Sequence, residues 1–266
     1  MTASAGANRT RLVSLAAGTI LDIGPAEAVE VAAAAGWPAV GIWFDPASWT
    51  PSRSQEVRQR LDDTGVVALD IEPVILGPDG DPGEALIEAA VAIGARHVLV
   101  ASRLADHAKV TDRFGALCDL AAGTDVKVVL EFLPIFGVRT LIEACTIVRA
   151  CGRANAGVLV DSLHLARSGS GPVDLRAVEA HLLPYLQLCD APAVAPDTSL
   201  GGLVEEALHG RSLLGDGGLP VAAVLDAVPD VPVSFELRSR ALNVAHPDPV
   251  ERAAAVLRNW REFSEP

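Results

Sequence analysis

Short runs of apolar, often β-branched residues alternate along this chain with longer stretches rich in Ala and Leu at helical spacing. Such runs are typical of strands that are buried on both faces, and the longer stretches are typical of amphipathic helices. The pattern predicts strands at residues 12–20, 39–44, 66–75, 97–101, 127–133, 157–161, 185–189 and 231–237. It predicts helices near residues 25–35, 53–64, 83–94, 104–122, 139–151, 173–180, 218–228 and 248–263.

This order of elements favours parallel strands that are joined by crossover helices. Eight strand–helix units in about 250 residues is the count of a (β/α)8 TIM barrel. We therefore predict an α/β fold in which residues 1–266 form a single TIM barrel domain. A doubly wound open sheet is the alternative, but no glycine-rich phosphate-binding fingerprint follows the first strand.

One connection is much longer than the others. Residues 191–217 separate the seventh predicted strand from the next predicted helix, whereas βα loops usually have about 2 to 6 residues. Long loops in compact domains are usually functional, so this segment is a candidate lid over a substrate.

Composition and charge restrict the function. The chain has 266 residues, half of them hydrophobic, which is enough for one large core and excludes a disordered chain. Because 34 acidic residues outnumber 21 Lys and Arg, giving a net charge of −13, we expect no nucleic-acid partner and no binding to an anionic membrane. No run approaches the roughly 18 to 20 apolar residues of a membrane span.

The four cysteines stand singly among apolar residues, which indicates reduced core thiols and a cytoplasmic protein. Arg9 and Arg11 precede an apolar run at 12–21 that could pass for a short signal peptide. A first buried strand explains this run better, because no small-residue cleavage site follows it.

Oxygen-bearing side chains occur at the ends of four consecutive predicted strands. They are Glu131, Asp161, Gln187 and Glu236. In a TIM barrel the active site is built from the carboxyl ends of the strands. We therefore predict that these four side chains meet at the mouth of the barrel.

Three carboxylates in one barrel mouth repel each other, by roughly 4 kcal/mol for each pair at about 4 Å and an effective dielectric near 20. A divalent cation would remove this penalty. An oxygen-only ligand set suits Mg²⁺ or Mn²⁺, with Co²⁺ as a further candidate, whereas zinc sites more often use His or Cys. The alternative is that each acid pairs with a basic residue, and Arg238 has the inward direction needed to neutralise Glu236.

Four segments of the second half resemble the xylose-isomerase-like barrel superfamily of sugar phosphate isomerases and epimerases. They are Leu-Glu-Phe-Leu-Pro at 130–134, Val-Asp-Ser-Leu-His-Leu-Ala-Arg-Ser-Gly at 160–169, Leu-Gln-Leu-Cys-Asp-Ala-Pro at 186–192 and Phe-Glu-Leu at 235–237. The family uses Glu, Asp, His and Glu as metal ligands on strands five to eight. The resemblance implies Glu131, Asp161, Gln187 and Glu236 as the ligands here, with Gln187 as a departure that is similar to bacterial 3-dehydroshikimate dehydratases.

The resemblance also implies roles for two further residues in substrate binding. His164 follows Asp161 by three residues, and Arg211 resembles an arginine that precedes a glycine pair and closes on substrate oxygens. A guanidinium fork suits a carboxylate, a phosphate or vicinal hydroxyl groups. Glu72 ends the third strand with inward direction, so it is a candidate for substrate binding or for an ion pair with Arg103.

These features predict a metal-dependent isomerase or epimerase that acts on a small polyhydroxylated carbonyl compound through an enediolate. Glu131 and Glu236 would move the proton, and His164 would orient the hydroxyl groups. The alternative is a dehydratase of the 3-dehydroshikimate type, because loss of a β-hydroxyl from the same intermediate gives dehydration. An apurinic endonuclease and a non-enzymatic sugar-binding protein are further alternatives. Related barrels often form dimers or tetramers, so a homo-oligomer is an open expectation.

Overall fold

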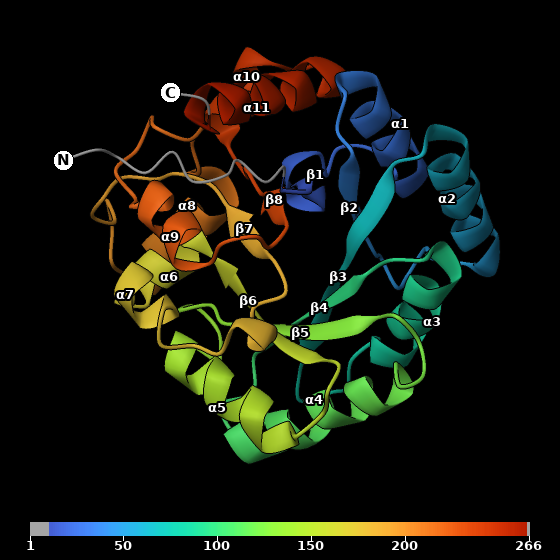
Figure 1. Ribbon diagram of the computed structural model, residues 1–266, viewed down its shortest axis with the longest axis vertical. Coiled ribbons are helices and arrows are strands. Elements are labelled where there is room, and N and C mark those ends of the chain that lie inside the picture. Colours follow the sequence, from blue (N-terminus) through green and yellow to red (C-terminus); the bar gives the residue numbers. More distant parts are fainter. Residues whose placement is uncertain (1–10, 265–266) are drawn as a thin grey trace.

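The computed structural model describes residues 11–264, and in it the strands close into a barrel in which each strand is parallel to both of its neighbours (Figure 1). The strands are β1 (Val13–Leu15), β2 (Ala39–Trp43), β3 (Val67–Leu76), β4 (His97–Ser102), β5 (Lys127–Glu131), β6 (Ala156–Asp161), β7 (Leu186–Leu188) and β8 (Val233–Phe235). Pairing of β8 with β1 closes the barrel. The predicted TIM barrel is confirmed, and the open sheet is wrong.

Helices surround the strands as an outer ring (Figure 1). They are α1 (Pro25–Ala35), α2 (Pro51–Thr64), α3 (Gly83–Ile93), α4 (His107–Leu120), α5 (Leu141–Cys151), α6 (Ser162–Arg167), α7 (Pro172–Leu175), α8 (Leu200–His209), α9 (Val221–Ala227), α10 (Arg240–Ala245) and α11 (Pro249–Ser264), with 3-10 turns η1 (Ala17–Thr19) and η2 (Ala180–Leu182). α2 illustrates the local signals: Thr50 caps its first turn, Pro51 opens it, and Gly65 ends it at a φ of 70°.

The elements differ from the predicted ones mainly after β6. The segment 191–217 is not a loop throughout, because it contains α8, which Ser199 caps by accepting a hydrogen bond from the Gly202 amide. Two adjacent glycines in the first turn of α8 hide it from a propensity-based prediction. The predicted helix at 173–180 shrinks to α7, and β1 is shorter than 12–20 because η1 follows it.

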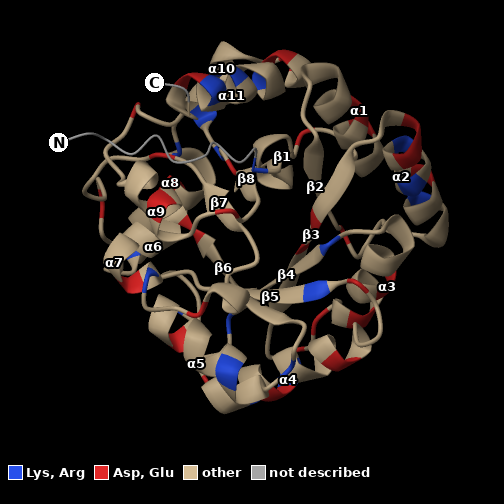
Figure 2. Ribbon diagram, viewed as in Figure 1, with Lys and Arg blue, Asp and Glu red and all other residues tan. Residues whose placement is uncertain are grey.

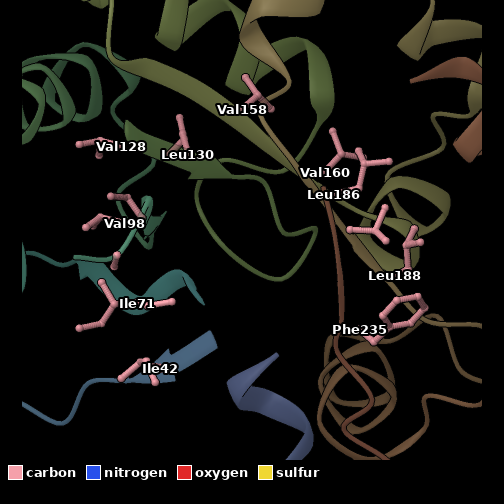
Figure 3. Packing of buried hydrophobic residues seen from close by; sticks show 14 of the residues in the cluster. Ile42, Ile71, Val98, Val128, Leu130, Val158, Val160, Leu186, Leu188 and Phe235 are labelled. Carbon is pink, nitrogen blue, oxygen red and sulfur yellow. The ribbon is translucent and has the colours of Figure 1, made fainter. Parts of the chain in front are cut away.

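The apolar side chains of the strands form two separate cores. One set faces the helices, and Figure 3 shows its members, such as Val128, Leu130 and Phe235, lining the outside of the strands. The other set fills the barrel interior and consists of Ala39, Leu69, Leu99, Val129, Leu159 and Tyr185. A TIM barrel interior is a packed core rather than a pore. The polar residues that face inward lie beyond this apolar interior, at the carboxyl ends of the strands.

Charged residues lie mostly on the outer helices, where both signs are interspersed (Figure 2). The first and last parts of the barrel are joined by Arg252 of α11, which is buried and contacts both carboxylate oxygens of Asp22 at 2.7 Å. Within residues 11–264 no helix combines the length and apolar character needed to cross a bilayer. Arg9 lies outside the described residues, and the run that follows it forms β1 and η1.

Candidate active site

A cavity of about 550 Å³ opens at the carboxyl ends of the strands. This volume lies within the range of about 300–1,000 Å³ that is usual for small-molecule sites. Its polar lining includes Glu72, Glu131, His164, Arg211, Glu236 and Arg238, and its apolar lining includes Trp43, Leu133, Ile135, Phe136 and Leu208. A larger groove, of about 770 Å³, lies on the outside between α2 and α3, but convergent ionisable groups single out the cavity at the strand ends.

The structure brings the four predicted ligand residues to this end of the barrel. Glu131 and Asp161 are the last residues of β5 and β6, Gln187 lies in β7, and Glu236 directly follows β8. Asp161 and Gln187 are direct partners in the β6–β7 register. All four side chains are buried.

Arg211 places its guanidinium between two of these carboxylates. Its Nη1 lies 2.6 Å from Oδ2 of Asp161, and its Nη2 lies 3.1 Å from Oε2 of Glu236. The residue is only 3% exposed, so this cation belongs to the floor of the cavity rather than to a mobile loop. Sequence reasoning placed Arg211 near the substrate but did not foresee these ion pairs.

Glu236 has a second basic partner. Nε of Arg238 lies 3.1 Å from Oε1 of Glu236, so the ion pair considered from the sequence is present. The guanidinium of Arg238 also lies over the Trp43 ring, 5.4 Å from its centroid. The carboxylate fits here because residue 18 is glycine, as a Cβ at that position would overlap Oε1 of Glu236.

Asp161 ends its strand and starts the next helix at the same time. Its Oδ1 accepts hydrogen bonds from the backbone amides of Leu163 at 2.8 Å and His164 at 3.0 Å, which caps α6. Burial acts to raise the pKa of Asp161, but Arg211, His164 and these hydrogen bonds outweigh burial and hold the pKa below its usual value. The cap explains why His164 lies beside Asp161.

Glu131 and His164 face each other across the cavity floor. Oε1 of Glu131 lies 4.0 Å from Nε2 of His164. Burial, together with the charges of Glu236 and Asp161, raises the pKa of Glu131 well above its usual value. Burial also lowers the pKa of His164. A carboxyl group with a raised pKa next to a neutral imidazole is suited to exchanging protons near neutral pH.

Gln187 is buried, and within the described residues neither polar atom of its amide makes a hydrogen bond of ordinary geometry, although the amide lies close enough to Glu72 to act against the rise in the pKa of that carboxyl group. A buried amide without partners costs free energy, so such an atom indicates a missing ligand or ion. The possible metal ligands around it are carboxylate and amide oxygens, which suit a hard divalent cation. Residues 11–264 contain no group of three or more His, Cys, Asp or Glu side chains already arranged as a metal site. Arg211 lies between Asp161 and Glu236 and forms an ion pair with each of them.

Two further carboxylates lie in β3, and only Glu72 was predicted. Glu72 is buried at the cavity, and burial with the charge of Asp70 raises its pKa well above the usual value. No ion pair joins it to Arg103 in the described part of the chain. Asp70 was missed, although it has the same inward direction two residues earlier. Burial and the charge of Glu236 raise the pKa of Asp70 to about 7.

The segment after β7 is held in place by Asp190. Its Oδ2 accepts hydrogen bonds from the amides of Gly215 at 2.9 Å and Gly217 at 3.1 Å, and its Oδ1 accepts one from Leu219 at 2.9 Å. Gly217 must be glycine, because a Cβ there would overlap the carbonyl of Ala191. This network fixes the turn that follows Arg211.

Two curated relatives are 3-dehydroshikimate dehydratases. The chain is 27% identical to the enzyme of Pseudomonas aeruginosa over 76% of its length, and 25% identical to the enzyme of Pseudomonas putida over 75%. It spans only 33% of either relative. The whole activity of these larger proteins therefore does not transfer by similarity alone.

Solved structures share the fold. A fusion protein of a xylose isomerase-like TIM barrel and a 4-hydroxyphenylpyruvate dioxygenase superposes with a TM-score of 0.77 at 23% identity, covering 94% of this chain and 42% of that one. The IOLI protein with a bound zinc atom gives 0.79 at 18% identity, covering 95% and 97%. The D-allulose 3-epimerase of Methylomonas sp. gives a TM-score of 0.70 at 16% identity, covering 95% of this chain and 98% of that one.

A family model described as "Xylose isomerase-like TIM barrel" matches residues 29–260. The match covers the strands from β2 to β8, including the four residues at the strand ends. With the closed eight-stranded barrel and the acidic cavity at its carboxyl end, this match shows that the chain belongs to the xylose isomerase-like TIM barrel family.

Proposed function

We propose that the protein is a divalent-metal-dependent enzyme that removes a proton next to a carbonyl group in a small hydroxylated compound. Glu131, Asp161, Gln187 and Glu236 would hold Mg²⁺ or Mn²⁺, with Co²⁺ as a substitute. The single observation that carries this proposal is the buried amide of Gln187, which makes no hydrogen bond of ordinary geometry in residues 11–264 although buried carboxyl groups surround it. When bound, such an ion would polarise the carbonyl group and stabilise developing negative charge on its oxygen.

The side chains of the cavity supply the proton chemistry. Within residues 11–264 no arginine makes an ion pair with Glu131, and burial raises its pKa, so Glu131 is the candidate base. Glu236 can serve as the second proton carrier. The neutral imidazole of His164, 4.0 Å from Glu131, can donate a hydrogen bond to a substrate hydroxyl group. Arg211 and Arg238 offset negative charge as the proton moves.

Among the outcomes of this step, dehydration is favoured by two findings. Gln187 stands where ketose epimerases of the resembled family usually have histidine, and the two curated relatives are dehydratases. After removal of the proton, loss of a β-hydroxyl group as water completes the elimination. Isomerisation or epimerisation is the second candidate, because Glu131 and Glu236 both line the cavity and could exchange the proton on two faces of a substrate.

A two-part assay tests the proposal. Protein loaded with Mn²⁺ or Mg²⁺ is incubated in deuterated water with 3-dehydroshikimate and with a panel of ketoses, and ultraviolet absorbance and deuterium uptake are followed. Dehydration predicts new absorbance from an aromatic acid, and epimerisation predicts deuterium in recovered ketose. Ligand binding that survives a chelator, with no exchange on any substrate, would instead support a sugar-binding protein. Nicking of abasic DNA would support an endonuclease.

A further inference from the structure

Arg103 stands directly after β4, on the same rim as the candidate catalytic residues. Its backbone is fixed on both sides: its amide donates to the carbonyl of Leu76 at 3.0 Å, and the amide of Gly137 donates to the carbonyl of Ser102 at 2.7 Å. A Cβ at Gly137 would overlap the carbonyl of Leu104, so the loop after β5 packs directly on this segment. Arg103 therefore projects from an anchored part of the rim.

The side chain of Arg103 lines the cavity from its outer end. Its guanidinium lies over the ring of Phe136, 5.4 Å from the centroid, and the residue is exposed. It differs from the two other arginines of the cavity. Arg211 and Arg238 are paired with carboxylates, whereas Arg103 has no acidic partner within residues 11–264.

The negative charge of the chain and of the cavity floor suggests a role for the Arg103 guanidinium. The chain carries a net charge of −13, and the floor of the cavity is acidic, so an anionic substrate would be repelled without a local positive group. A guanidinium that stacks on an aromatic ring keeps its N–H edge available for a carboxylate or phosphate. Apolar side chains, including Ile135 and Leu208, line the same cavity.

We propose that Arg103 binds an anionic group of the substrate, a carboxylate or a phosphate, while the carbonyl and hydroxyl groups reach the floor near Glu131. The inference rests on the proposed function and narrows its substrate class. The substrate is then an anionic polyhydroxylated carbonyl compound rather than a neutral sugar. Because Arg103 contacts no residue of the proposed proton relay, it acts on specificity rather than on the chemical step.

Binding of matched ligand pairs tests this inference without turnover. The pairs are 3,4-dihydroxybenzoate against catechol, and D-fructose 6-phosphate against D-fructose, each measured by calorimetry with the Mn²⁺-loaded protein. The first pair isolates a carboxylate and the second a phosphate. We expect the wild type to bind the anionic member of one pair about tenfold more tightly than the neutral member. A factor of about ten is what one charge-assisted, bidentate hydrogen bond from a guanidinium group would contribute.

Arg103→Gln should remove this preference, and Arg103→Lys should keep part of it. Arg149→Gln is the matched control, because Arg149 is an exposed arginine of α5 that pairs with Glu179 outside the cavity. An unchanged preference in Arg103→Gln, or no preference in the wild type for either pair, overturns the inference.

Kinetics separate this inference from the proposed function. With an active anionic substrate, Arg103→Gln should raise KM about tenfold and leave kcat nearly unchanged. If the wild type shows no metal-dependent exchange with any compound but retains an Arg103-dependent anion preference, the proposed reaction is wrong and the anion site stands. A fall in kcat with unchanged KM overturns the assignment of Arg103 to substrate binding.

Discussion

Glu131 and Glu236 are both glutamates at the ends of strands, yet their surroundings differ. Glu236 contacts two arginines, whereas Glu131 has only His164 within ion-pair distance among the described residues. The pKa of Glu131 is accordingly raised by burial and by neighbouring acids. The difference assigns proton removal to Glu131 more readily than to Glu236.

Glu131→Gln should therefore lower kcat by about 10²- to 10⁴-fold, the usual contribution of a positioned base. The melting temperature of the metal-free protein should not fall, because the substitution replaces a buried ionisable group with a neutral amide of the same shape. Deuterium uptake by substrate and a thermal melt measure the two effects. Activity comparable to the wild type would remove Glu131 from the proton-transfer role.

His97 predicts a pH dependence that is independent of the site. Burial lowers its pKa from 6.5 to about 4, and its Nδ1 lies 2.8 Å from the carbonyl oxygen of Leu69. Because the unfolded chain takes up this proton at a higher pH than the folded protein does, stability should fall as the pH drops from 6.5 towards 4. The loss is at most roughly 3 kcal/mol.

His97→Asn should flatten this part of the curve. Urea unfolding of both proteins at several pH values gives the measurement, and the difference in slope isolates His97 from carboxylates that both proteins share. Parallel curves would show that His97 does not titrate in this way.

At the scale of elements, Asp190 organises the turn between α8 and α9. Asp190→Ala leaves four backbone amides, including those of Gly215 and Gly217, without their acceptor. We expect a loss of roughly 2–4 kcal/mol in unfolding free energy and faster hydrogen exchange at these amides, since each lost partner costs about 1–3 kcal/mol when buried and less when water can replace it.

Asp197→Ala is the control for this prediction. Asp197 is exposed and accepts a hydrogen bond from the amide of Ser199 at 2.8 Å, so its removal should cost much less unfolding free energy than Asp190→Ala. Equal costs for the two variants would contradict the role given to Asp190.

The sequence predicts regular elements well and irregular ones poorly. Strands β2 to β6 follow from continuous apolar runs, because such runs have few other stable placements in a barrel. α6 and α8 were not predicted. α6 depends on the cap by Asp161, which the pattern treated as a strand end only, and α8 has two adjacent glycines in its first turn.

Prediction of the site has a similar limit. Strand direction indicated that Glu131, Asp161, Gln187 and Glu236 face one mouth, because every second residue of a strand faces the same side. It could not indicate that Arg211, 50 residues after Asp161, inserts between two of them, since that contact depends on how α8 and the following turn pack. Asp70 was within reach of the same argument that identified Glu72.

For the whole molecule, we predict that metal stabilises a barrel that folds without it. Adding Mn²⁺ to chelator-treated protein should raise the melting temperature, by mass action on the folded state. Gln187→Leu should abolish most of this rise and leave the metal-free melting temperature equal or higher, because it replaces an unpartnered buried amide with an apolar group of similar size.

Calorimetric melts with and without Mn²⁺ measure both effects, and Gln187→Glu, which keeps an oxygen ligand, is the control. If Mn²⁺ raises the melting temperature of Gln187→Leu as much as that of the wild type, residue 187 is not a metal ligand.

The position of Arg211 has a consequence for how the mature protein is assembled. Burying several carboxylates close together ordinarily requires a positive charge beside them. Here the guanidinium of Arg211, from the same chain, supplies that charge in the folded barrel. The chain can therefore fold before the proposed metal ion binds. Under the proposed function, protein that lacks its divalent ion would then be folded but inactive.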